Sequence, residues 1–452
     1  MSQRSWVRNS STRTAGLRTE PGISRRLNSL AAAALTVIIG SGAFVLPSRL
    51  KAEDPIDRLA LLYKECRYFE LRDTLSEMKA NPSLALDFFR GATANIFNRL
   101  DAAIISLLRY LDGASPNSPL PLTKEAWGLL ADSYRRSGQY RKSAEAQRLI
   151  LSRFEAELDA FEKDNRRNQD VIWSSLADVP APTIEMSRGS IIQLENRHFP
   201  VRIKDRVFYC VYDTGANLSV LYQSAANELG LALHGPGIKI QSGTGKWIDG
   251  RMAVVPEMRL GEAIVRNAVF LVLPDDYFHV WHVRAGVERR GIIGVPILTA
   301  FKELTETRDG RLLIPARPSP RSVQNMGFYG FMPIVEVLHR GARLSFSLDT
   351  GSSATFLHPP FFRRYRGEIE ARSKLRTITM GGVGDARAVK IHILDEFAFK
   401  AGGMDIALKK IEVHTEVTHS STKLLFGTLG LDILGQCSQM TFNFESMSFV
   451  LE

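Results

Sequence analysis

The tripeptide Asp-Thr-Gly occurs twice in this chain of 452 residues, at Asp213–Gly215 and at Asp349–Gly351. Each copy carries one carboxyl group, and a carboxyl can act as a general acid or a general base. Two carboxyls that lie side by side cannot both ionise easily, so they share one proton and divide these roles. The chemistry to look for is therefore acid–base catalysis by a pair of aspartates.

The surroundings of the two triplets also repeat. Each triplet is followed 78 residues later by a Gly-apolar-apolar-Gly motif, at Gly291–Leu298 and at Gly427–Leu434. One offset of 136 superimposes the two blocks and keeps the alternation of apolar residues that a shared strand pattern requires. A single Asp-Thr-Gly is more often an ordinary turn. Two copies in register instead predict a duplicated lobe, with one carboxylate in each copy.

These motifs resemble those of the pepsin and retropepsin group of aspartic proteases, over roughly residues 187–452. In that family two lobes face each other, and each places the aspartate of its triplet at the bottom of a shared cleft. The resemblance implies that Asp213 and Asp349 form a catalytic dyad that activates water to hydrolyse peptide bonds. It also implies that the enzyme needs no metal and no organic cofactor.

The other triplet residues have supporting roles in this resemblance. Gly215 and Gly351 let the backbone turn tightly and approach the carboxylates, because glycine has no Cβ. In the family, the threonines that match Thr214 and Thr350 join the two loops. The Gly-apolar-apolar-Gly motifs look like the strands that pack under the catalytic loops.

The residue after each triplet differs between the two copies. Ala216 follows the first triplet and Ser352 follows the second. A serine hydroxyl at this position can donate to the carboxylate and favour its ionised form. With only one such donor, we expect a mildly acidic pH optimum, and we expect Ala216→Ser to extend activity to lower pH.

A glycine-rich segment between the first triplet and its apolar motif resembles the flap hairpin of pepsin-like enzymes, which closes over substrate. Ser242 stands where those flaps carry a tyrosine, so we expect no tyrosine contact with substrate from this position. The second copy has a similar segment, and two flaps fit the retropepsin pattern. A plain hairpin turn is the alternative for both segments. The predicted flap and substrate-binding residues are Ser242, Gly243, Thr244, Gly245, Gly382 and Gly384.

The first 52 residues form a basic leader. Their net charge is +7, whereas the whole chain has +10, so the remaining body has only +3 and gives no reason to expect nucleic-acid binding. The apolar run Leu30–Pro47 follows Arg25-Arg26 and predicts a signal peptide or one uncleaved membrane anchor. We expect an exported protein of the bacterial periplasm that contacts the membrane only if this segment stays. A mitochondrial transit segment is the lower-ranked alternative.

Residues 53–175 have few glycines and apolar residues at helical spacing, which predicts an all-α region. Trp127, Leu130, Ala131 and Tyr134 fit the opening of a tetratricopeptide repeat. A plain helical bundle explains the region equally well. Either form is typical of an interaction or regulatory module, so a protein partner can bind here.

Together these features predict a multidomain α+β chain. An N-terminal helical-repeat-like domain at 53–175 precedes two β-rich acid-protease lobes, at 187–317 and 325–452, that pair as a pseudo-dimer. The predicted function is an exported aspartic endopeptidase acting on proteins or peptides. The alternative is an inactive peptide-binding or scaffold protein, although a pure binder would not need a second carboxylate. The three cysteines, Cys66, Cys210 and Cys437, suit neither disulfides nor a metal site and read as buried filler.

Overall fold

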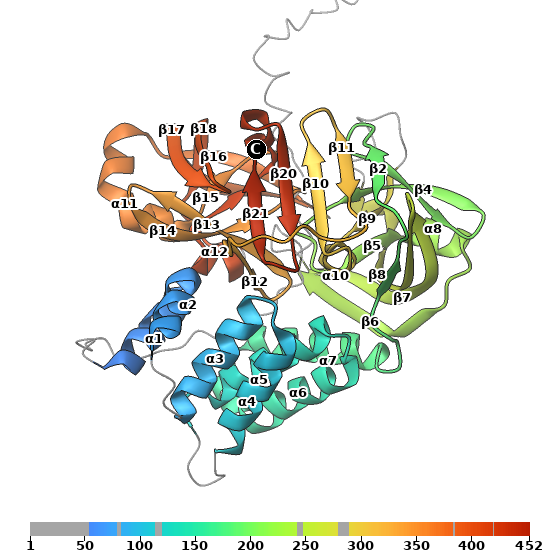
Figure 1. Cartoon of the computed structure of the whole chain (residues 1–452), viewed down its shortest axis with the longest axis horizontal. Coiled ribbons are helices and arrows are strands. Elements are labelled where there is room, and N and C mark those ends of the chain that lie inside the picture. The colour runs from blue at the N-terminus through green and yellow to red at the C-terminus, as the bar shows by residue number, and fades with distance from the viewer. Residues whose placement is uncertain are drawn as a thin grey trace, which may run out of the picture.

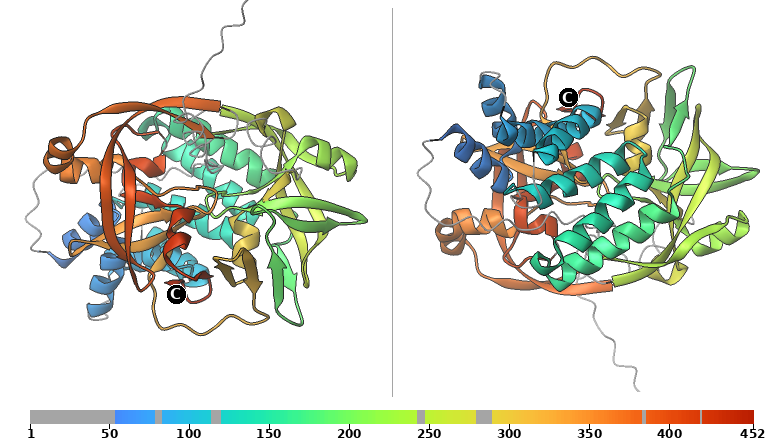
Figure 2. Two further views of the ribbon diagram at one scale, coloured as in Figure 1. Left: turned by 90° about the horizontal axis from the view of Figure 1, so that it is seen from above. Right: turned by 90° about the horizontal axis from the view of Figure 1, so that it is seen from below.

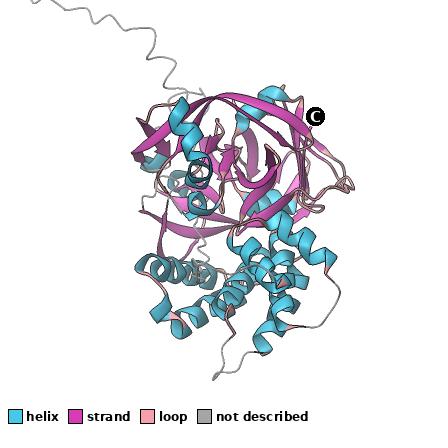
Figure 3. Cartoon of the chain, turned by 90° about the vertical axis from the view of Figure 1, so that its left-hand side faces the viewer, coloured by secondary structure: helices cyan, strands magenta, loops and turns pink. Residues whose placement is uncertain are grey.

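The computed structural model describes residues 54–78, 83–113, 120–241, 247–278, 289–382, 385–418 and 420–452. A layer of α-helices lies beneath two bodies of β-strands (Figure 1). Figure 3 shows the same division from the side, with a few helices among the strands. The predicted fold class, an all-α region followed by two β-rich lobes, is confirmed.

The N-terminal region is a series of packed helices. Neighbouring helices α3 and α4, α5 and α6, and α6 and α7 contact each other along their lengths. A capping box starts α7, in which the Glu162 N–H donates to Asp159 Oδ1 at 2.8 Å and the Asp159 N–H donates to Glu162. The helices are α1 (Pro55–Lys64), α2 (Tyr68–Glu77), α3 (Leu84–Ile96), α4 (Leu100–Asp112), α5 (Thr123–Arg136), α6 (Tyr140–Arg153) and α7 (Ala160–Ser175).

The first lobe is a curled sheet whose strands lie in the order β1-β8-β5-β9-β4-β3-β7-β6, and β7 also pairs with β8. Strand β9 lies parallel to β4 and antiparallel to β5. The elements are β1 (Thr183–Glu185), β2 (Ser190–Gln193), β3 (Phe199–Ile203), β4 (Arg206–Tyr212), β5 (Ser219–Tyr222), α8 (Gln223–Glu228), β6 (Leu233–Gln241), β7 (Trp247–Leu260), β8 (Ala263–Leu273), β9 (Arg289–Ile293), α10 (Val295–Ala300), β10 (Glu303–Thr307) and β11 (Arg311–Ile314).

The second lobe has the strand order β12-β13-β14-β19-β15-β18-β17-β16, and β13 also pairs with β17. Strand β19 lies parallel to β14 and antiparallel to β15, as β9 does to β4 and β5. The elements are β12 (Met326–Tyr329), β13 (Met332–His339), β14 (Ala342–Leu348), β15 (Phe356–Leu357), α11 (Pro359–Arg372), β16 (Arg376–Gly382), β17 (Asp385–Ala401), β18 (Met404–His414), α12 (Ser420–Leu424), β19 (Gly427–Leu429), the short helix η4 (Leu431–Gln436), β20 (Gln439–Asn443) and β21 (Ser448–Leu451).

The two lobes repeat each other at the offset read from the sequence. Strands β4 and β14 have the same bounds shifted by 136 residues, and so do β10 and β20. The repeat is looser elsewhere, since α11 is longer than α8. The duplication is therefore strictest in the strands that lead to the two triplets and in those that join the lobes.

A shared sheet joins the lobes in the order β2-β11-β10-β20-β21 and runs through the centre of Figure 1. Its middle strands β10 and β20 are antiparallel, and Thr305 lies opposite Thr441. The hydroxyl oxygens of these two threonines are 2.9 Å apart. Because these residues are equivalent in the two lobes, their pairing marks a pseudo-twofold arrangement.

The helical region packs against both lobes, as the views from above and below show (Figure 2). Helix α7 lies along β6 of the first lobe, and α3 and α2 contact β12 and β14 of the second. Arg343 of β14 donates to Asp73 of α2 at 2.7 Å. The helices thus bridge the two halves of the β body.

The described residues include no helix that is both long and apolar enough to span a membrane. The predicted leader and its apolar run Leu30–Pro47 lie outside the described residues.

Candidate active site

Each Asp-Thr-Gly triplet begins directly after equivalent strands, β4 and β14. The backbone N–H of Asp213 donates to the Ile293 carbonyl at 3.0 Å, and that of Asp349 donates to the Leu429 carbonyl at 3.0 Å. These bonds fix both triplets to the ends of β9 and β19. The side chains of Asp213 and Asp349 are buried, with 1% and 9% exposure.

The two carboxyl groups meet at the junction of the lobes, where they form a hydrogen bond with each other. Each also accepts a bond from its own loop. The N–H of Gly215 donates to Asp213 Oδ1 at 2.8 Å, and the N–H of Gly351 donates to Asp349 Oδ1 at 2.9 Å. A hydrogen bond between two carboxyls requires a proton on one of them, so the pair is built to hold one shared proton.

The threonines link the two loops to each other. The Thr214 hydroxyl accepts the N–H of Thr350 at 3.0 Å and donates to the Leu348 carbonyl at 2.8 Å. The Thr350 hydroxyl accepts the N–H of Thr214 at 3.0 Å and contacts the Tyr212 carbonyl at 3.4 Å. All four bonds cross between the lobes, so they set the separation of the two aspartates.

Gly351 is required by a close approach between the lobes. A Cβ at this position would lie 2.4 Å from Oδ2 and 2.6 Å from Cγ of Asp213. No side chain can be accommodated there unless Asp213 moves. The absence of a Cβ at Gly351 thus allows the first aspartate to reach the second loop.

Burial raises the pKa of both carboxyls, because the charged form is poorly solvated there. For Asp213, hydrogen bonds from Gly215, Asp349 and Ala216 and the charge of Arg289 oppose the rise in pKa. For Asp349, the charge on Asp213 adds to burial, so the pKa lies well above its usual value. Burial thus favours a single negative charge on the pair, and the positive charge of Arg289 favours placing it on Asp213.

The prediction that the Ser352 hydroxyl donates to the carboxylate of Asp349 is wrong. The Ser352 hydroxyl donates to the Ala354 carbonyl at 2.8 Å, and the backbone N–H of Ser352 is what donates to Asp349 Oδ1, at 3.1 Å. The backbone N–H of Ala216 serves Asp213 in the same way. Because a backbone group makes this bond in both lobes, the difference between alanine and serine supplies no extra donor.

Residues 199–297 match the aspartyl protease family. An aspartyl protease domain is therefore present in the first lobe. The matched segment contains Asp213 and the first Gly-apolar-apolar-Gly motif and ends before the second lobe.

The chain is also similar to a solved structure described as a retropepsin-like aspartic protease from Rickettsia conorii. The sequence identity is 17%, the match covers 30% of this chain and 92% of that one, and the TM-score is 0.20. No curated protein matches the chain in sequence.

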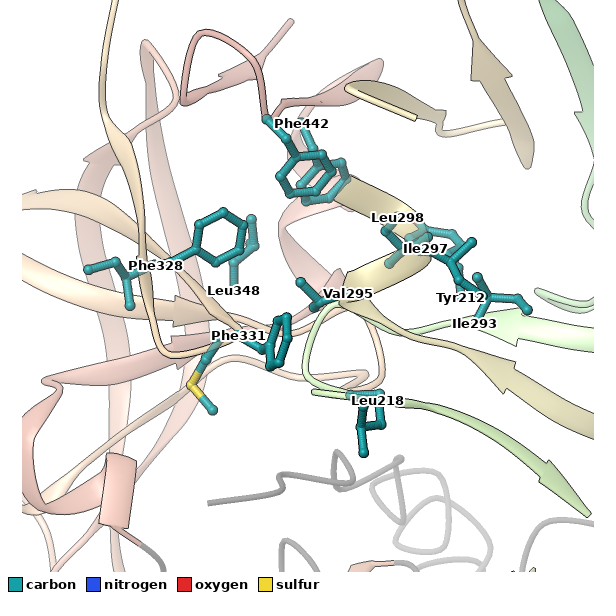
Figure 4. Close-up of a cluster of buried hydrophobic side chains, with 14 of the residues drawn as sticks. Tyr212, Leu218, Ile293, Val295, Ile297, Leu298, Phe328, Phe331, Leu348 and Phe442 are labelled. Carbon is teal, nitrogen blue, oxygen red and sulfur yellow. The ribbon is translucent and has the colours of Figure 1, made fainter. Parts of the chain in front are cut away.

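Behind the two Asp-Thr-Gly loops, the Gly-apolar-apolar-Gly motifs provide a close-packed base. A Cβ at Gly294 would lie 2.6 Å from the Ala216 carbonyl oxygen, and one at Gly430 would lie 2.5 Å from the Ala354 backbone. Buried apolar side chains from both lobes continue this base, and Figure 4 shows Val295 and Leu348 among them. The loops therefore rest on a rigid layer that fixes their position.

The predicted flaps fall on equivalent hairpins. Strands β6 and β7 pair up to Gln241 and Trp247, and β16 and β17 pair up to Gly382 and Asp385. Gly382 is the last residue of β16. The predicted tip residues Ser242, Gly243, Thr244, Gly245 and Gly384 lie outside the described residues.

Sequence reasoning missed Arg289 at the start of β9. Its charge acts on Asp213, and its Nε donates to His198 Nε2 at 3.2 Å. The equivalent position in the second lobe is Leu425. The sequence did contain a signal for this residue, because only the first copy has a cation at this position. That cation makes the electrostatic environments of the two aspartates unequal.

Proposed function

We propose that this chain is an aspartic endopeptidase whose two lobes share one catalytic site, with Asp213 and Asp349 as the dyad. One observation carries the proposal: the carboxyls of two equivalent, sequence-distant triplets are hydrogen-bonded to each other at the interlobe junction. The family match of the first lobe supports the same reading.

In the proposed reaction, ionised Asp213 takes a proton from a water molecule as the water attacks the peptide carbonyl carbon. Protonated Asp349 donates a hydrogen bond and then its proton to the carbonyl oxygen, which becomes negatively charged. The C–N bond of the tetrahedral intermediate then breaks as the proton on Asp213 passes to the leaving nitrogen, and one hydroxyl of the intermediate returns a proton to Asp349. The products are a carboxylic acid and an amine, and both aspartates return to their starting states.

The proposed pH range follows from the direction of the two pKa shifts. Activity requires Asp213 to be ionised, so it rises as the pH passes upward through the raised pKa of Asp213. It falls when Asp349 loses its proton, which happens only well above the usual range for aspartate. We therefore still expect a mildly acidic optimum, now because of burial.

The hairpins β6–β7 and β16–β17 are proposed to act as flaps that close over a bound peptide. The helical region has a position from which it can regulate the first of them. Phe161 of α7 contacts Trp247 of β7 with ring centroids 5.9 Å apart, and Asn168 accepts the Lys239 N–H of β6 at 3.2 Å. A protein that binds the helices is proposed to act through this contact.

The test is cleavage of a diverse peptide library by the purified protein between pH 3 and 8, with and without a statine-type inhibitor. We expect cleavage that the inhibitor abolishes. Asp213→Asn, Asp349→Asn and the double variant should each lose activity by orders of magnitude, because both carboxyls serve one step. A folded wild-type protein that cleaves nothing would favour the inactive binding protein instead.

Mixing the two single variants separates the proposed intrachain site from one formed between chains. We expect mixing to restore nothing, because every cleft would contain one asparagine. Recovered activity would show that lobes from different chains pair.

We also propose export, on the basis of the basic leader and the apolar run Leu30–Pro47. A reporter that works only outside the cytoplasm, fused after Glu452, should be active. Activity of a cytoplasm-dependent reporter at the same position would overturn the proposal.

A further inference from the structure

A cavity of about 50 Å³, lined by apolar and aromatic side chains together with several charged ones, lies between the helical region and the second lobe. Helices α5, α6 and α7 form one wall, and the turn between β12 and β13 forms another. Lys124, Gly128 and Tyr329 are half-buried at its edge. The charged and amide side chains that line it are Asn95, Lys124, Glu125, Asp132, Arg135, Gln147 and Arg166.

Two arginines in this lining have unused donors. Arg135 is 1% exposed, and neither its Nε nor its Nη1 has a hydrogen-bond partner among the described residues. Arg166 is 5% exposed, and its Nη1 donates to Gln147 at 2.9 Å while its Nε has no such partner there. Buried guanidinium N–H groups are costly to leave unpaired.

The carboxylates nearby do not balance the positive charge. Asp132 already accepts bonds from Arg135, from Arg136 at 3.1 Å and from Asn95 at 2.8 Å. Glu125 is also buried, which raises its pKa and favours its neutral form.

Arg135 remains a cation at neutral pH, because burial lowers its pKa only to about 10. Lys124 pairs with Glu157, at 3.3 Å. Two buried guanidiniums, those of Arg135 and Arg166, therefore line the cavity beside Asp132, whose carboxylate already accepts three bonds.

We propose that this cavity binds one oxyanion group, a carboxylate or a phosphate, between Arg135 and Arg166. An oxyanion accepts several N–H bonds and supplies the missing negative charge, whereas water supplies no charge. The volume admits about three water molecules or one small anion. It does not admit a peptide chain or a large polyanion such as citrate.

The site lies where the helical region is attached to the protease body. Arg136 donates to the Gly330 carbonyl at 3.2 Å, and the Arg135 guanidinium lies over the Phe331 ring at 5.3 Å from its centroid. Figure 4 places Phe331 in one apolar cluster with Leu218 and Val295, next to the first catalytic loop. A bound anion would therefore stabilise the attachment of the helices to the second lobe.

The experiment measures the melting temperature of the full chain in acetate, inorganic phosphate, citrate and chloride at equal ionic strength and pH 7. We expect acetate or phosphate to raise the melting temperature in a saturable way. Citrate should raise the melting temperature no more than chloride does. The acetate and phosphate arms distinguish the two sources of the oxyanion. If neither exceeds chloride, the cavity holds water only and the proposal is wrong.

Variants test the location of the site. Arg166→Met should increase the anion concentration needed for half of the rise in melting temperature about tenfold or more, since a charged hydrogen bond is lost. Arg167→Met is the matched control on the same helix, because Arg167 is exposed and pairs with Asp164.

Should Arg166→Met not fold, Gly128→Leu gives the second test. A Cβ at Gly128 has no neighbour closer than 3.8 Å, so leucine can fill the edge of the cavity and favours the helix. An undiminished response in Gly128→Leu, or an equal loss in Arg167→Met, would refute the assignment.

Discussion

The link between the two Asp-Thr-Gly loops can be tested by removing one hydroxyl at a time. Valine replaces a threonine hydroxyl with a methyl group at nearly constant volume. Thr214→Val would leave the Thr350 N–H and the Leu348 carbonyl without this partner. Thr350→Val would do the same to the Thr214 N–H and the Tyr212 carbonyl.

The bond lengths predict that the two variants differ. A buried N–H without a partner costs about 1–3 kcal/mol, and a typical buried hydrogen bond contributes about 1 kcal/mol. Both variants lose an N–H bond of 3.0 Å, but the second bond is 2.8 Å for Thr214 and 3.4 Å for Thr350. Since 3.4 Å is at the weak end of the range, Thr214→Val should cost about 2–4 kcal/mol of the free energy of unfolding. Thr350→Val should cost about 1 kcal/mol less.

Urea unfolding monitored by tryptophan fluorescence measures the difference, with midpoints compared at unchanged slope. Thr214→Ser and Thr350→Ser are the controls, because each keeps the hydroxyl and loses only a buried methyl, worth about 1 kcal/mol. Peptidase activity should fall in both valine variants and persist in both serine variants. If the valine variants are no less stable than the serine variants, the interlobe hydrogen bonds do not hold the loops together.

Further substitutions test the rest of the dyad. Gly351→Ala should reduce activity by about 100-fold or more, since its Cβ would lie 2.4 Å from Asp213 Oδ2 and displace that carboxyl; near-normal kcat would contradict this. Arg289→Leu should raise the pKa of Asp213, because a nearby positive charge is lost, and move the acid limb of the pH profile to higher pH. Arg290→Leu is its control, and equal shifts in both would argue against a specific effect. Ser352→Ala should leave the acid limb unchanged, because its hydroxyl does not serve the carboxylate; a shift would restore the original expectation.

The sequence by itself determined the duplication and the fold class. Two Asp-Thr-Gly triplets and two Gly-apolar-apolar-Gly motifs share one offset, and strands β4 and β14 obey it in the structure. Such motifs can be read from sequence because they depend on local chemistry: a glycine where the backbone turns tightly and alternating apolar residues in a half-buried strand. The helical region was predictable for the same reason, from apolar residues at helical spacing.

Only the tertiary structure decided how the groups around the dyad interact. Which atom donates to Asp349 depends on the rotation of one hydroxyl, and sequence patterns do not specify it. Arg289 acts on Asp213 although 76 positions of the chain separate them. The Arg135 N–H groups without partners can be identified only once the structure shows that this side chain is buried. Hydrogen bonds and charges act through space, so their partners are set by packing between segments and not by the residue types alone.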